Sequence, residues 1–275
     1  QYLTVREIGS GGFGIVWEAY DFSLKNFVAI KKLHNSLITE QKFIEMFYKE
    51  ALIGRNLIHD NIVRAHHFWH GSDGGYYLLS DYVRGRDLEY LLKKCKELNI
   101  KMSEEIAICI CNGILKALYY ASVLAKDPLT GKPYGLVYRD ISPGNVIITF
   151  DGTVKLSDFG IATIAGGVSC ETQKRTITGK YGYMSPEQME GDTDIDHMSD
   201  IFSCGVILYE MLSNLQLFSG DNEEIKHQLL QTTFDTESLK KIGICDELIN
   251  IIAKALERDK QKRYQTAIEM FNDLN

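Results

Sequence analysis

A short stretch in the middle of the chain constrains its fold and chemistry more than any other. Val137–Asn145 reads VYRDISPGN, and a DFG triplet begins at Asp158, thirteen residues after Asn145. Carboxylate and amide oxygens are ligands that Mg²⁺ accepts, and a further carboxylate can orient a hydroxyl and take its proton. The order and spacing of Asp140, Asn145 and Asp158 therefore predict a metal-assisted phosphoryl-transfer site.

A glycine cluster lies near the start of the chain. Gly9–Val16 reads GSGGFGIV and fits the pattern G-x-G-x-x-G-x-V between two strand-like runs. Glycines let backbone N–H groups approach phosphate oxygens without interference from Cβ. An ordinary hairpin turn is the alternative, whereas a dinucleotide site would open a helix.

A lysine ends the third strand-like run, where Val28–Lys31 reads VAIK. Burying an unpaired ammonium is costly, so Lys31 needs an acidic partner unless it extends along the surface to water. Glu50, in the helical pattern that follows, is the expected partner, and Glu45 and Glu40 are its competitors.

Hydrophobic periodicity divides the chain into a strand-rich front and a helix-rich back. Such a division predicts an α+β fold with two lobes, an N-lobe over 1–82, a hinge at about 81–85 and a C-lobe over 86–275. Strands are expected at 2–9, 14–21, 26–33, 61–71 and 75–83, and helices at 40–57, 103–125, 199–212 and 266–274. Ser103 is the expected N-cap of one helix, and Thr266 with Glu269 has the spacing of a capping box.

Composition indicates a globular protein, with 45% hydrophobic and 24% charged residues among 275. A net charge of −7 argues against nucleic acid and polybasic membrane surfaces as partners. The sequence shows no signal-peptide pattern, and we expect no apolar run of the roughly 20 residues that span a bilayer. Its six cysteines lack metal-site spacing and suggest unpaired thiols in a reducing cytoplasm. We therefore expect a cytoplasmic protein, or the cytoplasmic domain of a larger one, without membrane contact by this segment.

From Glu7 to about Leu274 the chain resembles the protein kinase superfamily, and within it the bacterial serine/threonine kinases of eukaryotic type. The glycine loop, VAIK, YRDISPGN and DFG appear in order, and Ser185–Glu187 reads SPE where the family has APE. The resemblance implies a bilobal kinase fold that transfers the γ-phosphoryl group of ATP to serine or threonine hydroxyls on a protein substrate. It also implies Mg²⁺ as the metal, with Mn²⁺ as an alternative.

The resemblance assigns roles to individual residues. Lys31 would hold the nucleotide phosphates while paired to Glu50, and Asp140 would orient the attacking hydroxyl. Asn145 and Asp158 would hold the metal. The residues expected around the nucleotide lie on the glycine loop, the strands beside it, the hinge and the floor of the cleft: Ile8, Gly9, Ser10, Gly11, Gly12, Phe13, Gly14, Val16, Ala29, Lys31, Ser80, Asp81, Val83 and Ile147.

Other expectations concern the frame of the site. By resemblance, Asp200 would anchor the backbone of the catalytic loop, and Arg263 would pair with Glu187. Tyr138 stands where the family has histidine, and its aromatic ring should keep the packing against Phe159.

The chain departs from the family at two positions. The lysine usually found two residues after the catalytic aspartate is replaced by Ser142, and the threonine of the substrate-docking loop is replaced by Lys180. The two positions touch in the family fold, so the cation and the hydroxyl would have exchanged places beside Asp140. Transition-state electrostatics need the charge in place, whichever segment supplies it. The competing interpretation is a solvated lysine and a slow site.

Activation is expected to use the segment before the docking loop. A phosphate on Thr176, or as second choice Thr178, could pair with Arg139 and order that segment. A transient homodimer would allow one copy to phosphorylate another. Two alternatives to an active protein kinase are a pseudokinase that acts as a nucleotide-gated binding module and a small-molecule phosphotransferase.

Overall fold

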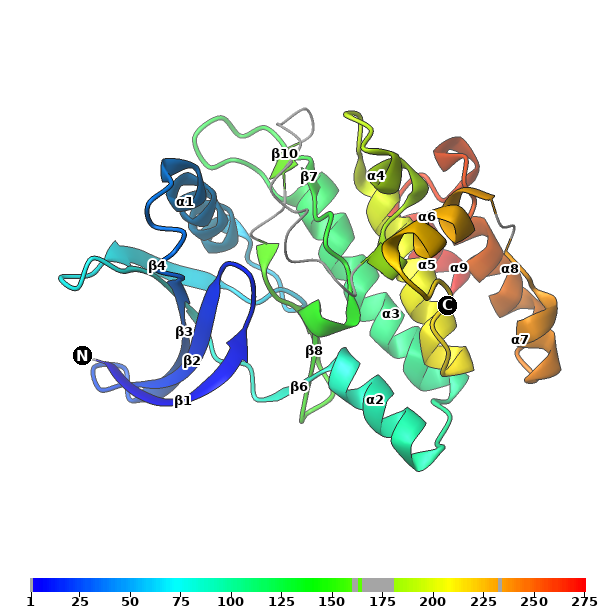
Figure 1. Ribbon diagram of the computed structural model, residues 1–275, viewed down its shortest axis with the longest axis horizontal. Helices are drawn as coiled ribbons and strands as arrows, with labels where there is room; N and C mark the ends of the chain where they lie inside the picture. Colours follow the sequence, from blue (N-terminus) through cyan, green and yellow to red (C-terminus); the bar gives the residue numbers. More distant parts are fainter. Residues whose placement is uncertain (1, 160–162, 165–180, 232–233) are drawn as a thin grey trace.

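A five-stranded antiparallel sheet forms one end of the molecule, and a bundle of helices forms the other (Figure 1). The structure is a computed structural model that describes residues 2–159, 163–164, 181–231 and 234–275. The strands of the large sheet lie in the order β1-β2-β3-β5-β4. Their bounds are β1 (Tyr2–Ser10), β2 (Gly14–Asp21), β3 (Asn26–Leu33), β4 (Ala65–His70) and β5 (Tyr76–Asp81).

One helix, α1 (Gln41–Asn56), covers one face of this sheet. Its buried Phe47 packs with Leu33 and Leu78 of the strands in a small hydrophobic cluster. Burial of such a side chain contributes about 1.5–3 kcal/mol relative to exposure. The apolar spacing that predicted a helix therefore places its hydrophobic side on the sheet.

The remaining strands lie between the large sheet and the helices. A three-stranded sheet has the order β6-β8-β9, and β7 and β10 form a separate antiparallel pair of two-residue strands. Their bounds are β6 (Gly85–Asp87), β7 (Leu136–Val137), β8 (Val146–Thr149), β9 (Val154–Leu156) and β10 (Thr163–Ile164). The predicted catalytic groups lie in the loops next to these short strands, between β7 and β8 and after β9.

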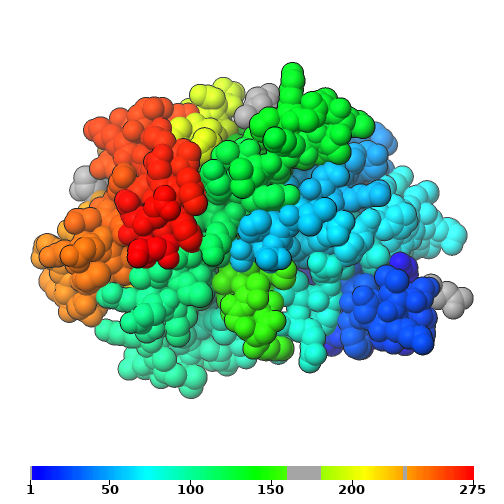
Figure 2. Space-filling view, turned by 180° about the vertical axis from the view of Figure 1, so that it is seen from behind, coloured from blue at the N-terminus to red at the C-terminus, as the bar shows by residue number. Residues whose placement is uncertain are grey.

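The helical part is organised around α5 (His197–Ser213), which is buried at every position from Met198 to Leu212. Helix α3 (Glu104–Tyr119) packs against it and continues as one π-helical turn, Tyr120–Leu124. Figure 2 shows the C-terminal segment, in red, far from the blue N-terminal strands. The other helices are α2 (Leu88–Leu98), α4 (Pro186–Glu190), α6 (Asn222–Gln231), α7 (Glu237–Lys241), α8 (Asp246–Ala255) and α9 (Ala267–Asp273).

The α+β, two-lobed fold class predicted from periodicity is confirmed. The lobe boundaries at 82 and 86 stay a prediction, although β5 ends at Asp81 and β6 begins at Gly85. The predicted strand at 61–71 is too long, because β4 begins only at Ala65.

One helix is apolar enough to resemble a membrane span. By length and composition the run Glu104–Leu124, which comprises α3 and the π-helical turn, passes such a test, so the expectation that no run reaches this length was wrong. Its apolar residues Ala107, Ile114 and Leu115 are fully buried in the main hydrophobic cluster. Burial on this scale is typical of a core helix.

Helix caps follow the sequence in one case and not in another. Ser103 caps α3 as expected, since its Oγ accepts a hydrogen bond from Ile106 N at 3.4 Å. The capping box predicted at Thr266 and Glu269 was wrong. The Thr266 hydroxyl is buried without a hydrogen-bond partner among the described residues, and Glu269 accepts instead from Gln265 N. The spacing is right, but the side chain of Thr266 points into the protein rather than at the helix end.

A buried ion pair joins the start of α4 to the loop before α9. Arg263 Nη1 and Nη2 donate to Glu187 Oε1 and Oε2 at 2.6 and 2.8 Å, and Ser199 Oγ donates to Oε1 at 2.6 Å. The Arg263 side chain is 0% exposed. Burial opposes ionisation of Glu187, but the bonds from Arg263 outweigh it and lower the pKa of that carboxyl. The pairing expected from the resemblance is confirmed.

Removing Arg263 should leave a buried carboxylate without its counter-ion. We expect Arg263→Ala to lower the free energy of unfolding by about 3–5 kcal/mol, measured by urea denaturation. Lys94→Ala, which breaks an exposed pair with Glu97, is the control and should leave the urea midpoint unchanged. A loss of stability at Arg263 no larger than in this control would contradict the assignment.

Candidate active site

A cleft of about 290 Å³ contains most of the predicted nucleotide residues. Of that set, the lining includes Ile8, Gly9, Val16, Ala29, Lys31, Ser80, Asp81, Val83 and Ile147, together with Glu50 and Asp158. The remaining members of the set, Ser10, Gly11, Gly12, Phe13 and Gly14, belong to the glycine turn and do not line it. The lining residues therefore come from β1, β2, β3, β5, β8 and α1 and from the segments after β5 and β9, which are far apart in the chain.

Several lining residues were missed from the sequence, among them Arg6, Tyr82 and Asp87. Arg6 forms a 2.7 Å ion pair with Glu18 across β1 and β2 and donates a 3.1 Å hydrogen bond to Tyr82 Oη. It therefore ties the first strand to the segment after β5. Arg6 and Ile8 share one face of β1 by strand alternation, which is the signal that could have identified it.

The glycine turn between β1 and β2 is closed by backbone bonds. Gly11 N donates to Gly14 O at 3.0 Å, and His34 N donates to Phe13 O at 3.0 Å. A Cβ on Gly14 would lie 2.2 Å from the Lys32 carbonyl oxygen, so only glycine allows β2 to pair with β3 there. At Gly9 and Gly11 a Cβ would meet nothing within 4 Å. Gly14 serves packing, whereas the earlier glycines face open space.

An ammonium group lies between two carboxylates at the inner end of the cleft. Lys31 Nζ is 2.8 Å from Glu50 Oε1 and 2.7 Å from Asp158 Oδ1. Lys31 comes from β3, Glu50 from α1 and Asp158 from the segment after β9. The ion pair predicted with Glu50 is present, and Glu40 pairs instead with Lys42.

The pKa values in this group show which charges stabilise which. Burial works against the Lys31 ammonium, but the Asp158 and Glu50 carboxylates outweigh it and raise the pKa of Lys31. Burial also raises the pKa of Glu50, and Lys31 opposes that rise. Lys31 is thus shared by two carboxylates that come from different segments. Carboxylate oxygens of this kind are ligands that a hard divalent cation accepts.

Asp140 and Asn145 form a second polar group in the loop before β8. Asn145 Nδ2 donates to the Asp140 carbonyl and to Asp140 Oδ2, both at 2.8 Å. The Asn145 side-chain oxygen is the atom that remains for other ligands. Ser157 N donates to Asn145 O at 3.0 Å, which joins this loop to the residue next to Asp158. The three groups predicted from spacing thus belong to two adjoining segments.

The backbone of this loop is anchored from beneath by α5. Asp200 Oδ2 and Oδ1 accept hydrogen bonds from Tyr138 N at 2.8 Å and Arg139 N at 2.7 Å. Burial raises the pKa of Asp200 to about 7, although these two N–H groups oppose the shift. Arg139 has φ 66, a left-handed conformation that a non-glycine residue adopts only when its surroundings hold it. Gln188, on α4, adds a 2.9 Å bond to the Arg139 carbonyl.

Tyr138 packs as expected from the resemblance. Its ring meets Phe159 edge to face at 4.7 Å, and its hydroxyl donates to the Ser157 carbonyl. Asp158, between those residues, has φ 54. The tyrosine therefore supports the strained turn that aims Asp158 at Lys31.

The residues fit a nucleotide-bound divalent cation in the chemistry of their donor atoms. Asn145 and Asp158 would supply hard oxygens, and Mg²⁺ commonly takes one or two such ligands and completes its shell with phosphates and water. No cluster of three or more histidine, cysteine, aspartate or glutamate side chains suited to a metal occurs in the part of the chain that the structure describes. A cation here would therefore depend on ligands from the nucleotide.

Some predicted residues lie outside the described residues, namely Lys180, Thr176 and Thr178. Ser142 is described and is 4% exposed. Its hydroxyl has no hydrogen-bond partner among the described residues. The exchange of cation and hydroxyl therefore stays a prediction.

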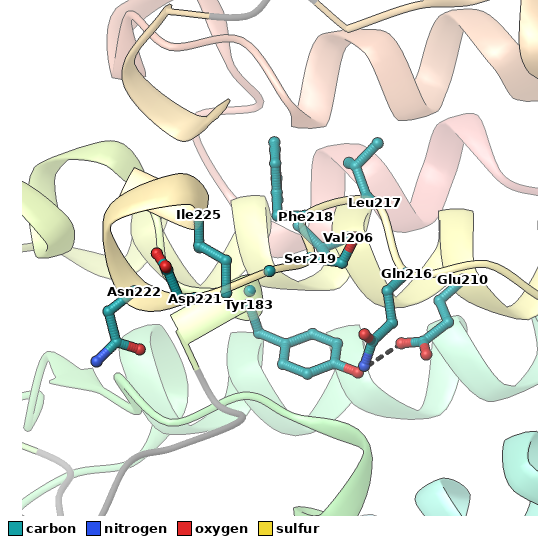
Figure 3. Close-up of a pocket in the computed structure, with 12 residues that line it drawn as sticks. Tyr183, Val206, Glu210, Gln216, Leu217, Phe218, Ser219, Asp221, Asn222 and Ile225 are labelled. Carbon is teal, nitrogen blue, oxygen red and sulfur yellow. Dashed lines mark hydrogen bonds between the residues drawn. The ribbon is translucent and has the colours of Figure 1, made fainter. Parts of the chain in front are cut away.

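A second cavity, of about 270 Å³, is lined by the segment before α4, by α5 and by residues 216–225 at and before the start of α6 (Figure 3). Tyr183 Oη donates to Glu210 Oε2 at 2.5 Å, and Ser203 Oγ donates to the Tyr183 carbonyl at 2.7 Å. Burial raises the pKa of both Tyr183 and Glu210. These bonds fix the predicted substrate-docking segment on the buried helix, and the cavity holds none of the catalytic groups predicted from the sequence.

Comparison with known proteins agrees with this geometry. The family described as protein kinase domain matches residues 2–273. The chain is 32% identical to the serine/threonine-protein kinase PrkC of Bacillus subtilis, covering 100% of this chain and 40% of the relative. It is 32% identical to the probable serine/threonine-protein kinase PknB of Bifidobacterium longum, covering 100% and 39%. It is also 32% identical to the tyrosine-protein kinase MasK of Myxococcus xanthus, covering 99% and 42%. The chain thus spans about two fifths of the length of these curated relatives.

The charge balance around Lys31 can be tested by its reactivity. Replacing Glu50 by glutamine removes one of two carboxylates that stabilise the ammonium, so the pKa of Lys31 should fall and its neutral fraction should rise. We expect Glu50→Gln to speed the labelling of Lys31 by an amine-directed reagent, by about tenfold for each unit of pKa. Mass spectrometry measures the rate, and Lys32, which pairs with Asp73, is the internal control. A labelling rate at Lys31 equal to or slower than that of the unchanged protein would contradict this balance.

Proposed function

This chain belongs to the protein kinase family, and from that premise we propose that it transfers the γ-phosphoryl group of Mg·ATP to serine or threonine hydroxyls of a protein substrate. The observation that carries the proposal is the group at the inner end of the cleft, where Lys31 contacts Glu50 and Asp158 at 2.8 and 2.7 Å. A buried ammonium beside a phosphate site, with oxygen donors next to it, is suited to hold polyphosphate and metal together.

Each described residue then has a role that its position supports. Lys31 would bind the phosphates, and Glu50 would keep it in place. Asn145 and Asp158 would hold Mg²⁺, with Mn²⁺ as an alternative, which neutralises charge on the phosphates. Asp140 would orient the hydroxyl and accept its proton, and the 2.8 Å bond from Asn145 Nδ2 holds its carboxylate in one orientation.

A pseudokinase is the first alternative, and it is disfavoured by what the chain retains. A scaffold has no chemical need for Lys31, Asp140, Asn145 and Asp158 together.

A small-molecule phosphotransferase is the second alternative. Such enzymes usually lack a docking segment, whereas here Glu187 pairs with Arg263 and the segment before α4 is bonded to α5. The names of PrkC and PknB favour serine or threonine as the acceptor, and that of MasK makes tyrosine the competing acceptor.

Self-activation is part of the proposal. Arg139 Nε is buried without a hydrogen-bond partner among the described residues, and Nη2 makes a single 3.4 Å bond to the Ile195 carbonyl. Burial lowers the pKa of Arg139, although the Asp200 carboxylate opposes the shift, so a further anion beside the guanidinium would add to the compensation of its charge. A phosphate on Thr176, or on Thr178, would supply that compensation, and a transient homodimer would allow one copy to modify another.

The cellular setting follows from the substrate. ATP is supplied in the cytoplasm, so the proposal places this chain there or on the cytoplasmic side of a larger protein. The five cysteines that the structure describes are free thiols, which fits a reducing compartment.

The function is tested by incubation of the protein with labelled ATP, Mg²⁺ and a generic basic protein. We expect label on serine or threonine of the added protein and on Thr176 or Thr178 of the chain itself, mapped by mass spectrometry. Asp140→Asn should abolish both. Binding of ATP without transfer would support the pseudokinase, and label on tyrosine alone would reverse the assigned acceptor.

We also propose that Lys180 supplies the charge that the family takes from the position of Ser142. The hydroxyl of Ser142 supports this proposal, because it is buried and has no hydrogen-bond partner among the described residues. A partner for it would therefore come from outside them, as Lys180 would. Lys180→Ala should lower kcat by about 10²–10³-fold, the usual cost of losing a charge-stabilising group, with the Kd for ATP little changed. Lys101→Ala, which changes an exposed lysine between α2 and α3 that does not line the cleft, is the control. Turnover of the Lys180 variant within twofold of the unchanged protein would refute the exchange.

A further inference from the structure

The segment between the π-helical turn and β7 is a folded hairpin rather than a loose connection. Asp127 N donates to Lys132 O and Tyr134 N donates to Ala125 O, both at 2.9 Å. Asp127 Oδ1 accepts from two further backbone N–H groups, at 2.9 and 2.7 Å. Gly131 has φ 68, which the tight end of the turn requires. We call residues 125–134 the catalytic-loop hairpin.

The base of this hairpin is part of the core, whereas its tip is in solvent. Ala125 is 2% exposed, Tyr134 packs against the main hydrophobic cluster, and Leu129 at the tip is 94% exposed. Directly after the base come β7 and then Tyr138 and Arg139, whose N–H groups are held by Asp200. The base therefore has a fixed position relative to the catalytic loop.

The hairpin also touches α1, 78 residues earlier in the chain. Asn56, the last residue of α1, donates from Nδ2 to the Tyr134 hydroxyl oxygen at 2.9 Å. In Figure 1 the loop before β7 arches toward α1. In Figure 2 the green atoms of this loop lie against the lighter blue atoms of the segment where α1 ends. A side-chain bond therefore links the end of α1 to the hairpin base.

A second tyrosine contacts the residues that directly follow α1. Tyr120, in the π-helical turn that leads into the hairpin, accepts a 3.2 Å hydrogen bond from Ile58 N on its hydroxyl. The His59 ring stacks on the Tyr120 ring at 4.9 Å. Tyr120 lies just before the hairpin, and Tyr134 lies at its C-terminal end. Both side chains bond to residues at or just after the end of α1.

The position of the end of α1 decides where Glu50 lies. Glu50 is six residues before Asn56, less than two helical turns and about 9 Å along the axis. A rigid helix fixed at its last residue therefore keeps Glu50 at a set height beside Lys31. Without the bond from Asn56, the end of α1 would depend on its packing against β4 and on the Tyr120 contacts.

We propose that Tyr134 is a positioning residue, and that the catalytic-loop hairpin couples the location of α1, and with it the Lys31–Glu50 pair, to the loop that carries Asp140. The inference rests on the proposed kinase function for its kinetic consequences, but its structural part does not. The sequence suggests no such role, because the hairpin carries no motif and Asn56 is remote from it.

The test is a double-mutant cycle with Asn56→Ala and Tyr134→Phe. Each single change should lower kcat about 2- to 10-fold, the usual effect of one hydrogen bond, and leave KM for ATP within twofold because the cleft lining is intact. The double variant should be no slower than the slower single variant, since both remove the same bond. A role confined to stability would lower the unfolding midpoint and leave kcat unchanged.

Two controls and a second measurement complete the test. Tyr119→Phe removes a hydroxyl with no hydrogen bond among the described residues, and Leu129→Ala alters only the exposed tip; both should match the unchanged protein. Hydrogen exchange of the amides at 50–58 should accelerate in the Asn56 and Tyr134 variants but not in the controls, whether or not the protein phosphorylates anything. If the unchanged protein has no kinase activity but the variants still show this exchange pattern, the proposed function is refuted and the coupling stands. Unchanged exchange, or additive losses in kcat, would overturn the coupling.

Discussion

The arrangement of the cleft depends on one ammonium group. Lys31 reaches from β3 to carboxylates on α1 and on the segment after β9, with contacts of 2.8 and 2.7 Å. Burial alone would favour the neutral amine, yet the two carboxylates raise its pKa and keep it charged. A charge in this position is costly unless all three segments are in place. The ion pairs therefore report on, and help to fix, the relation between the sheet and the catalytic segments.

A buried frame beneath the cleft makes this arrangement reproducible. Asp200 on α5 holds two N–H groups of the catalytic loop, and the Glu187–Arg263 pair holds the start of α4 near the same helix. The loops above contain strained residues, because Arg139 and Asp158 both adopt left-handed backbone conformations. The fixed core carries the cost of holding polar side chains in orientations that an isolated loop would not keep.

Features with a strong local or chemical signal could be predicted from the sequence. The pair of Lys31 and Glu50 was predicted because a buried ammonium needs a partner and because the family resemblance favours Glu50, and the Ser103 cap was predicted from its place before an apolar run. The box at Thr266 failed because burial turned its hydroxyl away from the helix end. The bond from Asn56 to Tyr134 could not be predicted, since nothing in either segment specifies a contact across 78 residues. Tertiary packing decided both outcomes.

The most direct test of this account is the rate of γ-phosphoryl transfer in a single turnover with Lys31→Met, a variant that keeps the bulk of the side chain and removes its charge. If the ammonium organises the phosphates as described, the rate should fall by about 10²-fold or more. The free energy of unfolding should also fall, because Glu50 loses its counter-ion, so the rate is measured at a temperature at which the variant is fully folded. Transfer within twofold of the unchanged protein, at saturating ATP, would contradict the central role of this group.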